Sequence, residues 1–114
     1  MVWRLLLVAE LGNAFDWATT LIGVGGLHLV ELNPHAGLLI RAVGALWGIT
    51  LFKAAVGFEL AGMAAAAAWL GARRDGRACA LCLVALAAAG ALLWWVAAAN
   101  AQTLILYFRS TAAR

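Results

Sequence analysis

Residues 78–108 read ACALCLVALAAAGALLWWVAAANAQTLILYF, a stretch without a single Asp, Glu, Lys or Arg. About 20 apolar residues in a helix cross a hydrocarbon core of about 30 Å, so this stretch can span a bilayer. Two further apolar segments precede it, at about 2–26 and 36–71. The chain is 67% hydrophobic, whereas soluble domains are about 45–50% apolar. The sequence therefore predicts an all-α integral membrane bundle of three transmembrane helices, forming a single transmembrane domain over residues 1–114.

The second segment is longer than one straight span requires. As a single helix, residues 36–71 would extend about 54 Å, well beyond the hydrocarbon core. One arrangement is a helix that tilts and protrudes from the membrane. The other begins with a short re-entrant or interfacial helix over about 36–46, which turns at Gly44 or Gly48 into the true span. We expect the second arrangement.

Basic residues are concentrated at the ends of the apolar segments. Arg73, Arg74 and Arg77 share one short turn, and Arg109 and Arg114 lie near the C-terminus. Lys and Arg are enriched in cytoplasmic loops, so we expect this turn and the N-terminus to face the cytoplasm, in a prokaryotic cytoplasmic membrane. The two C-terminal arginines argue against this orientation. The pattern is not the basic stripe of a nucleic-acid-binding protein, and we expect no nucleic-acid partner.

Four polar residues fall on one side of the first predicted helix: Glu10, Asn13, Asp16 and Thr20. At 100° per residue they lie within an arc of about 120°, so this stripe should face protein or water rather than lipid. Asp16 is near mid-span, where a charged side chain costs about 2.5–3.5 kcal/mol on insertion scales and usually marks function. The structural alternative is a protonated Asp16 that hydrogen-bonds to a neighbouring helix.

Lys53 lies inside the second apolar segment and is the natural partner of Asp16 or Glu31. A carboxylate and an ammonium group stabilise each other's charged forms where the dielectric constant is low. We therefore predict an intramembrane ion pair between Lys53 and Asp16. The alternative is that the Lys53 side chain extends to a membrane interface. Glu59 faces another way, and either completes the cluster or faces another subunit.

The connection before the second segment is polar and contains a helix start signal. Asn33 is expected to cap the next helix, with Pro34 in its first turn. His and carboxylate side chains three or four residues apart can share a helix face and bind a metal ion. The residues that could bind a metal ion here are Asp16, Glu31, His28 and His35. The simpler interpretation is that both His side chains are solvated by water in the connection. Apart from this possible metal ion, the sequence predicts no cofactor.

Two short motifs in the third segment can each be interpreted either as packing residues or as functional residues. Cys79 and Cys82 form a C-x-x-C, which could exchange disulfides, but small packing residues are the favoured interpretation on a reducing cytoplasmic side. Trp94 and Trp95 could line a pocket for a lipid or quinone, although core packing is favoured. Polar residues beyond them, beginning with Asn100, could line the same cavity.

Small residues are abundant in the second segment. Gly44 and Gly48 form a G-x-x-x-G, and Gly57, Ala61 and Gly62 follow. Such residues allow close approach of helix backbones. Besides the lipid bilayer, we therefore expect this chain to contact copies of itself in a homo-oligomer, or the subunits of a larger membrane complex.

An ordered set of polar motifs links the first two segments. It comprises Asn13-x-x-Asp16-x-x-x-Thr20, then Glu31-x-Asn33-Pro34, then a single intramembrane Lys53. This pattern resembles a family of small prokaryotic multi-helix membrane proteins of unknown function, over roughly residues 10–105. The resemblance implies about three helices and a shared polar site at those positions, without implying an activity. The Cys pair and His35 lie outside the pattern.

The sequence favours binding or transport over catalysis. Asp16 would be the central group of an intramembrane polar site that binds or transports a proton, a metal ion or a small polar solute. The residues expected to form this site are Asn13, Asp16, Thr20, Glu31, Asn33 and Lys53. The alternative is an accessory or structural subunit of a larger membrane complex. A third interpretation is a lipid-acting enzyme that uses Asp16 and Glu31 as general acid and base.

Overall fold

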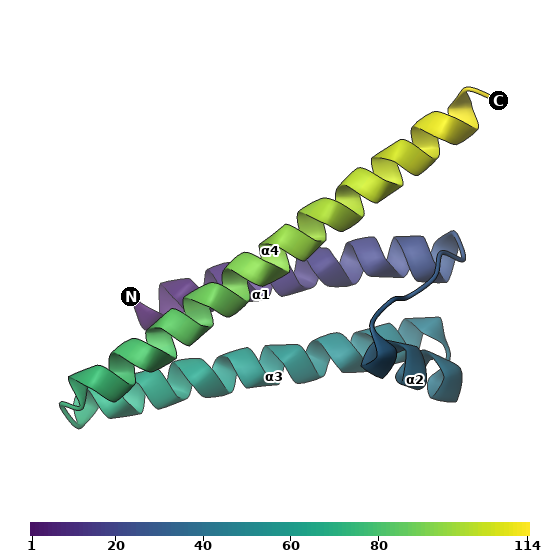
Figure 1. Ribbon diagram of the computed structural model, residues 1–114. Helices are drawn as coiled ribbons and strands as arrows, with labels where there is room; N and C mark the ends of the chain where they lie inside the picture. The colour runs from purple at the N-terminus through teal and green to yellow at the C-terminus, as the bar shows by residue number, and fades with distance from the viewer.

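The computed structural model describes residues 1–114 as an all-helical chain without strands (Figure 1). Its elements are α1 (Val2–Thr20), the π-helix η1 (Leu21–Gly26), α2 (Pro34–Val43), α3 (Ala45–Ala72) and α4 (Gly76–Ala112). Three continuous helical stretches, Val2–Gly26, Ala45–Ala72 and Gly76–Ala112, are long and apolar enough to cross a membrane. The predicted fold class, with three helices of membrane-spanning length, is confirmed.

The second apolar segment is divided at Gly44, as expected from its length. Gly44 has φ +90°, a backbone conformation that side-chain-bearing residues rarely adopt. Asn33 starts α2 as predicted, because its side-chain oxygen accepts hydrogen bonds from the backbone amides of His35 (2.9 Å) and Ala36 (3.3 Å). The short helix ends at Val43, a few residues before the expected end near residue 46.

The turn at Gly44 folds α2 back against the start of α3 (Figure 1). A Cβ atom at Gly48 would lie 2.6 Å from the backbone nitrogen of Ile40. The two helix backbones can therefore approach this closely only because residue 48 has no side chain. The G-x-x-x-G of this segment packs α2 on α3 within one chain.

The helix α1 packs against α4 and α3 through small residues. A Cβ atom added at Gly90 of α4 would lie 3.2 Å from the Cβ atom of Ala9. Trp94 lies over Gly12, and its indole nitrogen donates a hydrogen bond to the backbone oxygen of Val8 at 2.8 Å. Trp94 thus adopts the packing role that was favoured for it.

The protein buries little of itself, since only 15 of its 114 residues are buried. The core cluster is small and consists of Ala9, Leu60, Ala64 and Leu86. Large apolar side chains such as Phe58 (80% exposed) and Trp95 (75% exposed) point outward. Such exposure is disfavoured in water but is what the hydrocarbon of a bilayer solvates.

The two ends of the bundle differ. The N-terminus and the turn between α3 and α4 lie at one end, and the connection between η1 and α2 lies at the other (Figure 1). From the turn, α4 diverges from α3 along its length (Figure 1). Polar side chains of α1, α3 and α4, among them Asp16, Lys53 and Asn100, line the region between these helices.

Candidate intramembrane polar site

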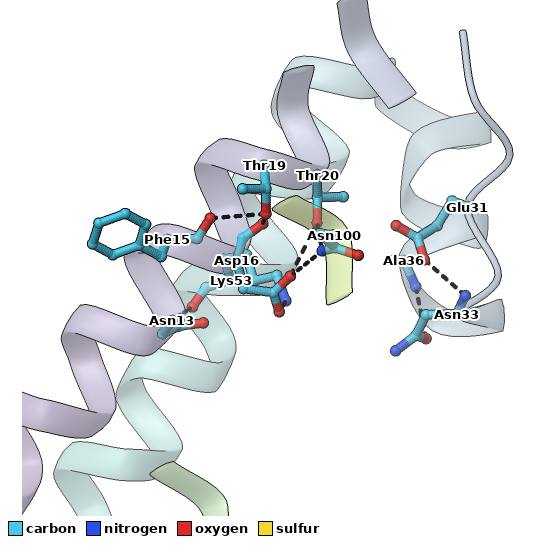
Figure 2. A network of polar contacts seen from close by, with 10 residues as sticks. All are labelled: Asn13, Phe15, Asp16, Thr19, Thr20, Glu31, Asn33, Ala36, Lys53 and Asn100. Carbon is cyan, nitrogen blue, oxygen red and sulfur yellow. Dashed lines mark hydrogen bonds and ion pairs between the residues drawn. The ribbon is translucent and has the colours of Figure 1, made fainter. Parts of the chain in front are cut away.

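The centre of the site is an ion pair between two membrane-spanning helices. Asp16 of α1 is 2% exposed, and its Oδ2 accepts a hydrogen bond from Nζ of Lys53 on α3 (Figure 2). This pairing agrees with the prediction from sequence. It follows from the cost of leaving either charge alone in a region of low dielectric constant.

The other carboxylate oxygen of Asp16 also has partners. Oδ1 accepts hydrogen bonds from the Thr20 hydroxyl at 3.1 Å and from the Asn100 side-chain amide at 2.9 Å (Figure 2). The Asn100 amide nitrogen also lies 3.2 Å from the Thr20 hydroxyl oxygen. A buried carboxylate is an acceptor only and needs several donors, and here α1, α3 and α4 each supply at least one. We call Asp16, Thr20, Lys53 and Asn100 the polar cluster.

Asn13 lies one helical turn before Asp16 and makes a different contact. Its side-chain nitrogen donates to the backbone oxygen of Lys53 at 3.0 Å, which ties α1 to α3. Its Oδ1 atom is buried and has no hydrogen-bond partner. Asn13 therefore borders the polar cluster without bonding to the Asp16 carboxylate.

Glu31 and Asn33 bond within their own turn instead of with the polar cluster. The Glu31 carboxylate accepts a hydrogen bond from the Asn33 backbone amide at 2.8 Å, and the Asn33 side chain caps α2 (Figure 2). Both residues nevertheless line the same cavity as Asp16 and Lys53. They lie at the end of that cavity formed by the connection before α2.

The cavity has a volume of about 610 Å³ and is bounded by α1, η1, the connection, α3 and α4. Volumes of about 300–1,000 Å³ are typical of sites for small molecules. Every member of the polar cluster lines it, while most of the remaining lining is apolar, as at Leu60, Leu93 and Val96. Some lining residues, among them Leu92 (63% exposed), are open to the surroundings. The cavity is therefore not sealed inside the bundle.

Glu59 also lines this cavity, at the middle of α3. Glu59 is exposed and takes part in no hydrogen bond. It has no ion-pair partner either, since the only ion pair of the protein joins Asp16 and Lys53. Glu59 thus shares the cavity with the polar cluster but does not complete that cluster by a hydrogen bond, and its contact with another subunit stays a prediction.

The four residues considered for a metal ion are not gathered together. No three of the His, Cys, Asp and Glu side chains lie close enough to hold one metal ion. His28 and His35 are both exposed, and Asp16 is paired with Lys53. The spacing argument required a continuous helix, but His28 has φ +57° in the connection and α2 begins only at Pro34.

The cysteines and the second tryptophan lie away from the cavity. Cys79 and Cys82 are free thiols, and the Cys79 sulfur lies 3.3 Å from the backbone oxygen of Ala67 on α3. This contact packs the start of α4 against the end of α3. Trp95 is exposed on α4 and absent from the cavity lining, so the core packing favoured for this residue is wrong, because its side chain points away from the other helices.

Asn100 was missing from the residues expected to form the site. As a polar residue in an apolar helix it could line a cavity, and it does so, but an asparagine in isolation indicates no particular partner. The signal that could have identified it is depth, because Asp16, Thr20 and Asn100 must occupy the same level for their side chains to meet.

The chain matches no protein-family model, no curated protein and no solved structure. The resemblance to a family of small prokaryotic membrane proteins stays a prediction. The fold and the site define a class on physical grounds alone: a small helical protein with three membrane-length helices around a cavity that is partly polar.

Proposed function

We propose that this protein binds, and in an oligomer transports, a small polar or charged ligand within the membrane. The cavity lined by the polar cluster would be the binding site, with Asp16 and Lys53 as its central charged groups. The protein would reside in a prokaryotic cytoplasmic membrane, with the N-terminus and the Arg73–Arg77 turn on the cytoplasmic side.

One observation carries this proposal: the buried ion pair lines a cavity instead of being enclosed by packed side chains. The side chain of Lys53 is 14% exposed, compared with 3% for the side chain of Asp16. An ion pair that only joined helices would need no open space beside it, whereas an ion pair that meets a ligand requires such a space. The space beside this pair is of a size that small ligands occupy.

The experiment uses the full chain purified in a mild detergent. Thermal unfolding would be followed by tryptophan fluorescence in the presence of alkali and divalent cations, amines and small polar solutes. Since a ligand that binds only the folded state stabilises it, about 2.7 kcal/mol of stabilisation is expected at 100 times its dissociation constant. Elemental analysis would show whether a metal ion co-purifies.

Two matched variants test whether such a ligand occupies the cavity. Ala89 lines the cavity, whereas Ala98 is exposed on α4 outside the lining. Ala89→Phe should abolish the ligand-dependent stabilisation, and Ala98→Phe should retain it. If no compound stabilises the protein, or if stabilisation survives Ala89→Phe, the proposed binding site is wrong.

A structural role is the second candidate, and a particular surface favours it. Ala61, Gly62 and Ala65 of α3 are exposed, and a Cβ atom at Gly62 would meet nothing within 4 Å. Small residues on an open helix face allow another helix to approach closely. Stoichiometric co-purification of other membrane subunits, together with no ligand-dependent stabilisation, would favour this role over ligand binding.

A further inference from the structure

The cavity contains one carboxylate that has no hydrogen-bond or ion-pair partner in the protein. Glu59 lies at the middle of α3, a helix long and apolar enough to cross a membrane. A carboxylate at this depth costs about 2.5–3.5 kcal/mol on insertion scales, and such residues usually line a functional path or cavity. Glu59 lines the cavity and has neither a hydrogen bond nor an ion-pair partner.

The charged groups of the cavity favour a positively charged ligand. Three carboxylates, those of Asp16, Glu31 and Glu59, line it together with one amine, that of Lys53. Lys53 is paired with Asp16, and Glu31 accepts a hydrogen bond from the uncharged Asn33 amide. The excess charge is therefore negative, and Glu59 is the lining carboxylate with both oxygens free to accept a donor, whereas one oxygen of Glu31 is already bonded.

The walls next to Glu59 are apolar. On α3 the neighbouring lining residues are Val56, Leu60 and Met63, and on α4 they include Leu92 and Leu93. A small inorganic cation needs several oxygen ligands to replace its hydration shell, and these walls offer none. An organic cation that carries its own hydrophobic body needs only apolar contact and one opposite charge.

We propose that the ligand of this cavity is an amphipathic organic cation, an amine or quaternary ammonium compound with a hydrophobic body. Its charged centre would lie at the Glu59 carboxylate and its body against the apolar walls between α3 and α4. Exposed lining residues such as Leu92 leave the cavity open on its surface, so a cation dissolved in the membrane could enter sideways. This inference rests on the proposed function and names its ligand class.

The test measures binding of tetraphenylphosphonium by equilibrium dialysis against the detergent-purified chain, with protein-free micelles as the blank. Tetraphenylborate has the same shape and the opposite charge, and choline has the charge without the hydrophobic body. We expect saturable binding of tetraphenylphosphonium that is at least about tenfold tighter than that of either comparison compound, which corresponds to about 1.4 kcal/mol.

Two carboxylate variants connect the binding to Glu59. Glu59→Gln should weaken tetraphenylphosphonium binding at least about tenfold. Glu10→Gln is the matched control, because Glu10 is also a spanning-helix carboxylate without an ion pair but does not line this cavity, and it should bind as the unmodified chain does. Because the Glu59 side chain is exposed and bonds to nothing, Glu59→Gln should fold normally, which thermal unfolding would verify.

The outcomes separate this inference from the proposed function. Equal binding of tetraphenylborate, or binding unaffected by Glu59→Gln, would overturn the ligand class. If a polar solute stabilises the protein in a manner blocked by Ala89→Phe while tetraphenylphosphonium does not bind, the inference fails and the proposed function stands. If neither kind of compound binds, both fail.

Discussion

The side-chain amide of Asn100 on α4 lies 2.9 Å from Oδ1 of Asp16 on α1. Because Oδ2 of the same carboxylate pairs with Lys53 on α3, one carboxyl group connects all three membrane-length helices. The position of α4 relative to the other two helices thus depends in part on the hydrogen bonds that the Asn100 side chain donates to Asp16 and Thr20 of α1.

Removing the hydrogen bonds of the Asn100 side chain should measurably destabilise the bundle. We expect Asn100→Ala to lower the free energy of unfolding by about 1–2 kcal/mol, within the range for hydrogen bonds between membrane helices and to charged groups. Titration with a denaturing detergent in mixed micelles would measure this. Gln102→Ala, at an exposed position two residues away, should change the free energy by less than about 0.5 kcal/mol. Equal effects of the two substitutions would contradict the assigned hydrogen bonds.

The ion pair should show coupling in a double-mutant cycle. Lys53→Met leaves the Asp16 carboxylate buried without its counter-charge, which should cost about 3–5 kcal/mol. Adding Asp16→Asn removes that charge and should restore part of the lost stability, so the two effects would be strongly non-additive. Unfolding titrations of the four proteins give the coupling energy, and simple additivity would refute the pairing.

The close contact between α2 and α3 makes Gly48 intolerant of a side chain. Gly48→Ala would place a methyl group 2.6 Å from the Ile40 backbone nitrogen, so the helices must separate, at an expected cost of about 1–3 kcal/mol. Gly62→Ala is the control, because its methyl group would meet nothing and should stabilise α3 by up to about 1 kcal/mol. Destabilisation of equal size at both positions would show that α2 does not pack against α3 in this manner.

The proposed orientation can be tested by labelling in intact bacterial cells. In a chain with both native cysteines changed to Ala, Ser110→Cys should react with a membrane-impermeant maleimide, because residue 110 is exposed near the end of α4 that we propose faces outward. Gly76→Cys, in the turn predicted to be cytoplasmic, should react only after the cells are lysed. The reverse pattern would mean that the arginines at the C-terminus determine the orientation.

Some features of this fold and site follow directly from sequence because strong physical costs determine them. A buried carboxylate needs a counter-charge, and this requirement predicts the pairing of Asp16 with Lys53 from the sequence. A segment too long for one span must tilt or break, and the structure breaks it at Gly44. In both cases few alternatives are physically acceptable.

Other features could not be read from sequence because they depend on how the helices cross. Asn100 is far from Asp16 in sequence, and their contact requires a particular depth and rotation of α4. Glu31 and Asn33 were expected to form part of the site, and both line the cavity, but local hydrogen bonds in the capping turn already occupy them. Hydrogen bonds between a side chain and the nearby backbone compete with contacts to other helices, and the spacing of residues in the sequence does not show which will form.

The close contact of Ala9 with Gly90 has a consequence for how the protein responds to its surroundings. Burial of apolar area drives little helix association in lipid, so the cohesion of the three helices depends on close van der Waals packing, interhelical hydrogen bonds and the surrounding acyl chains. Shortening those chains should loosen α4 from its neighbours while each helix keeps its own backbone hydrogen bonds. The lipid matrix thus acts as the outer layer of the fold.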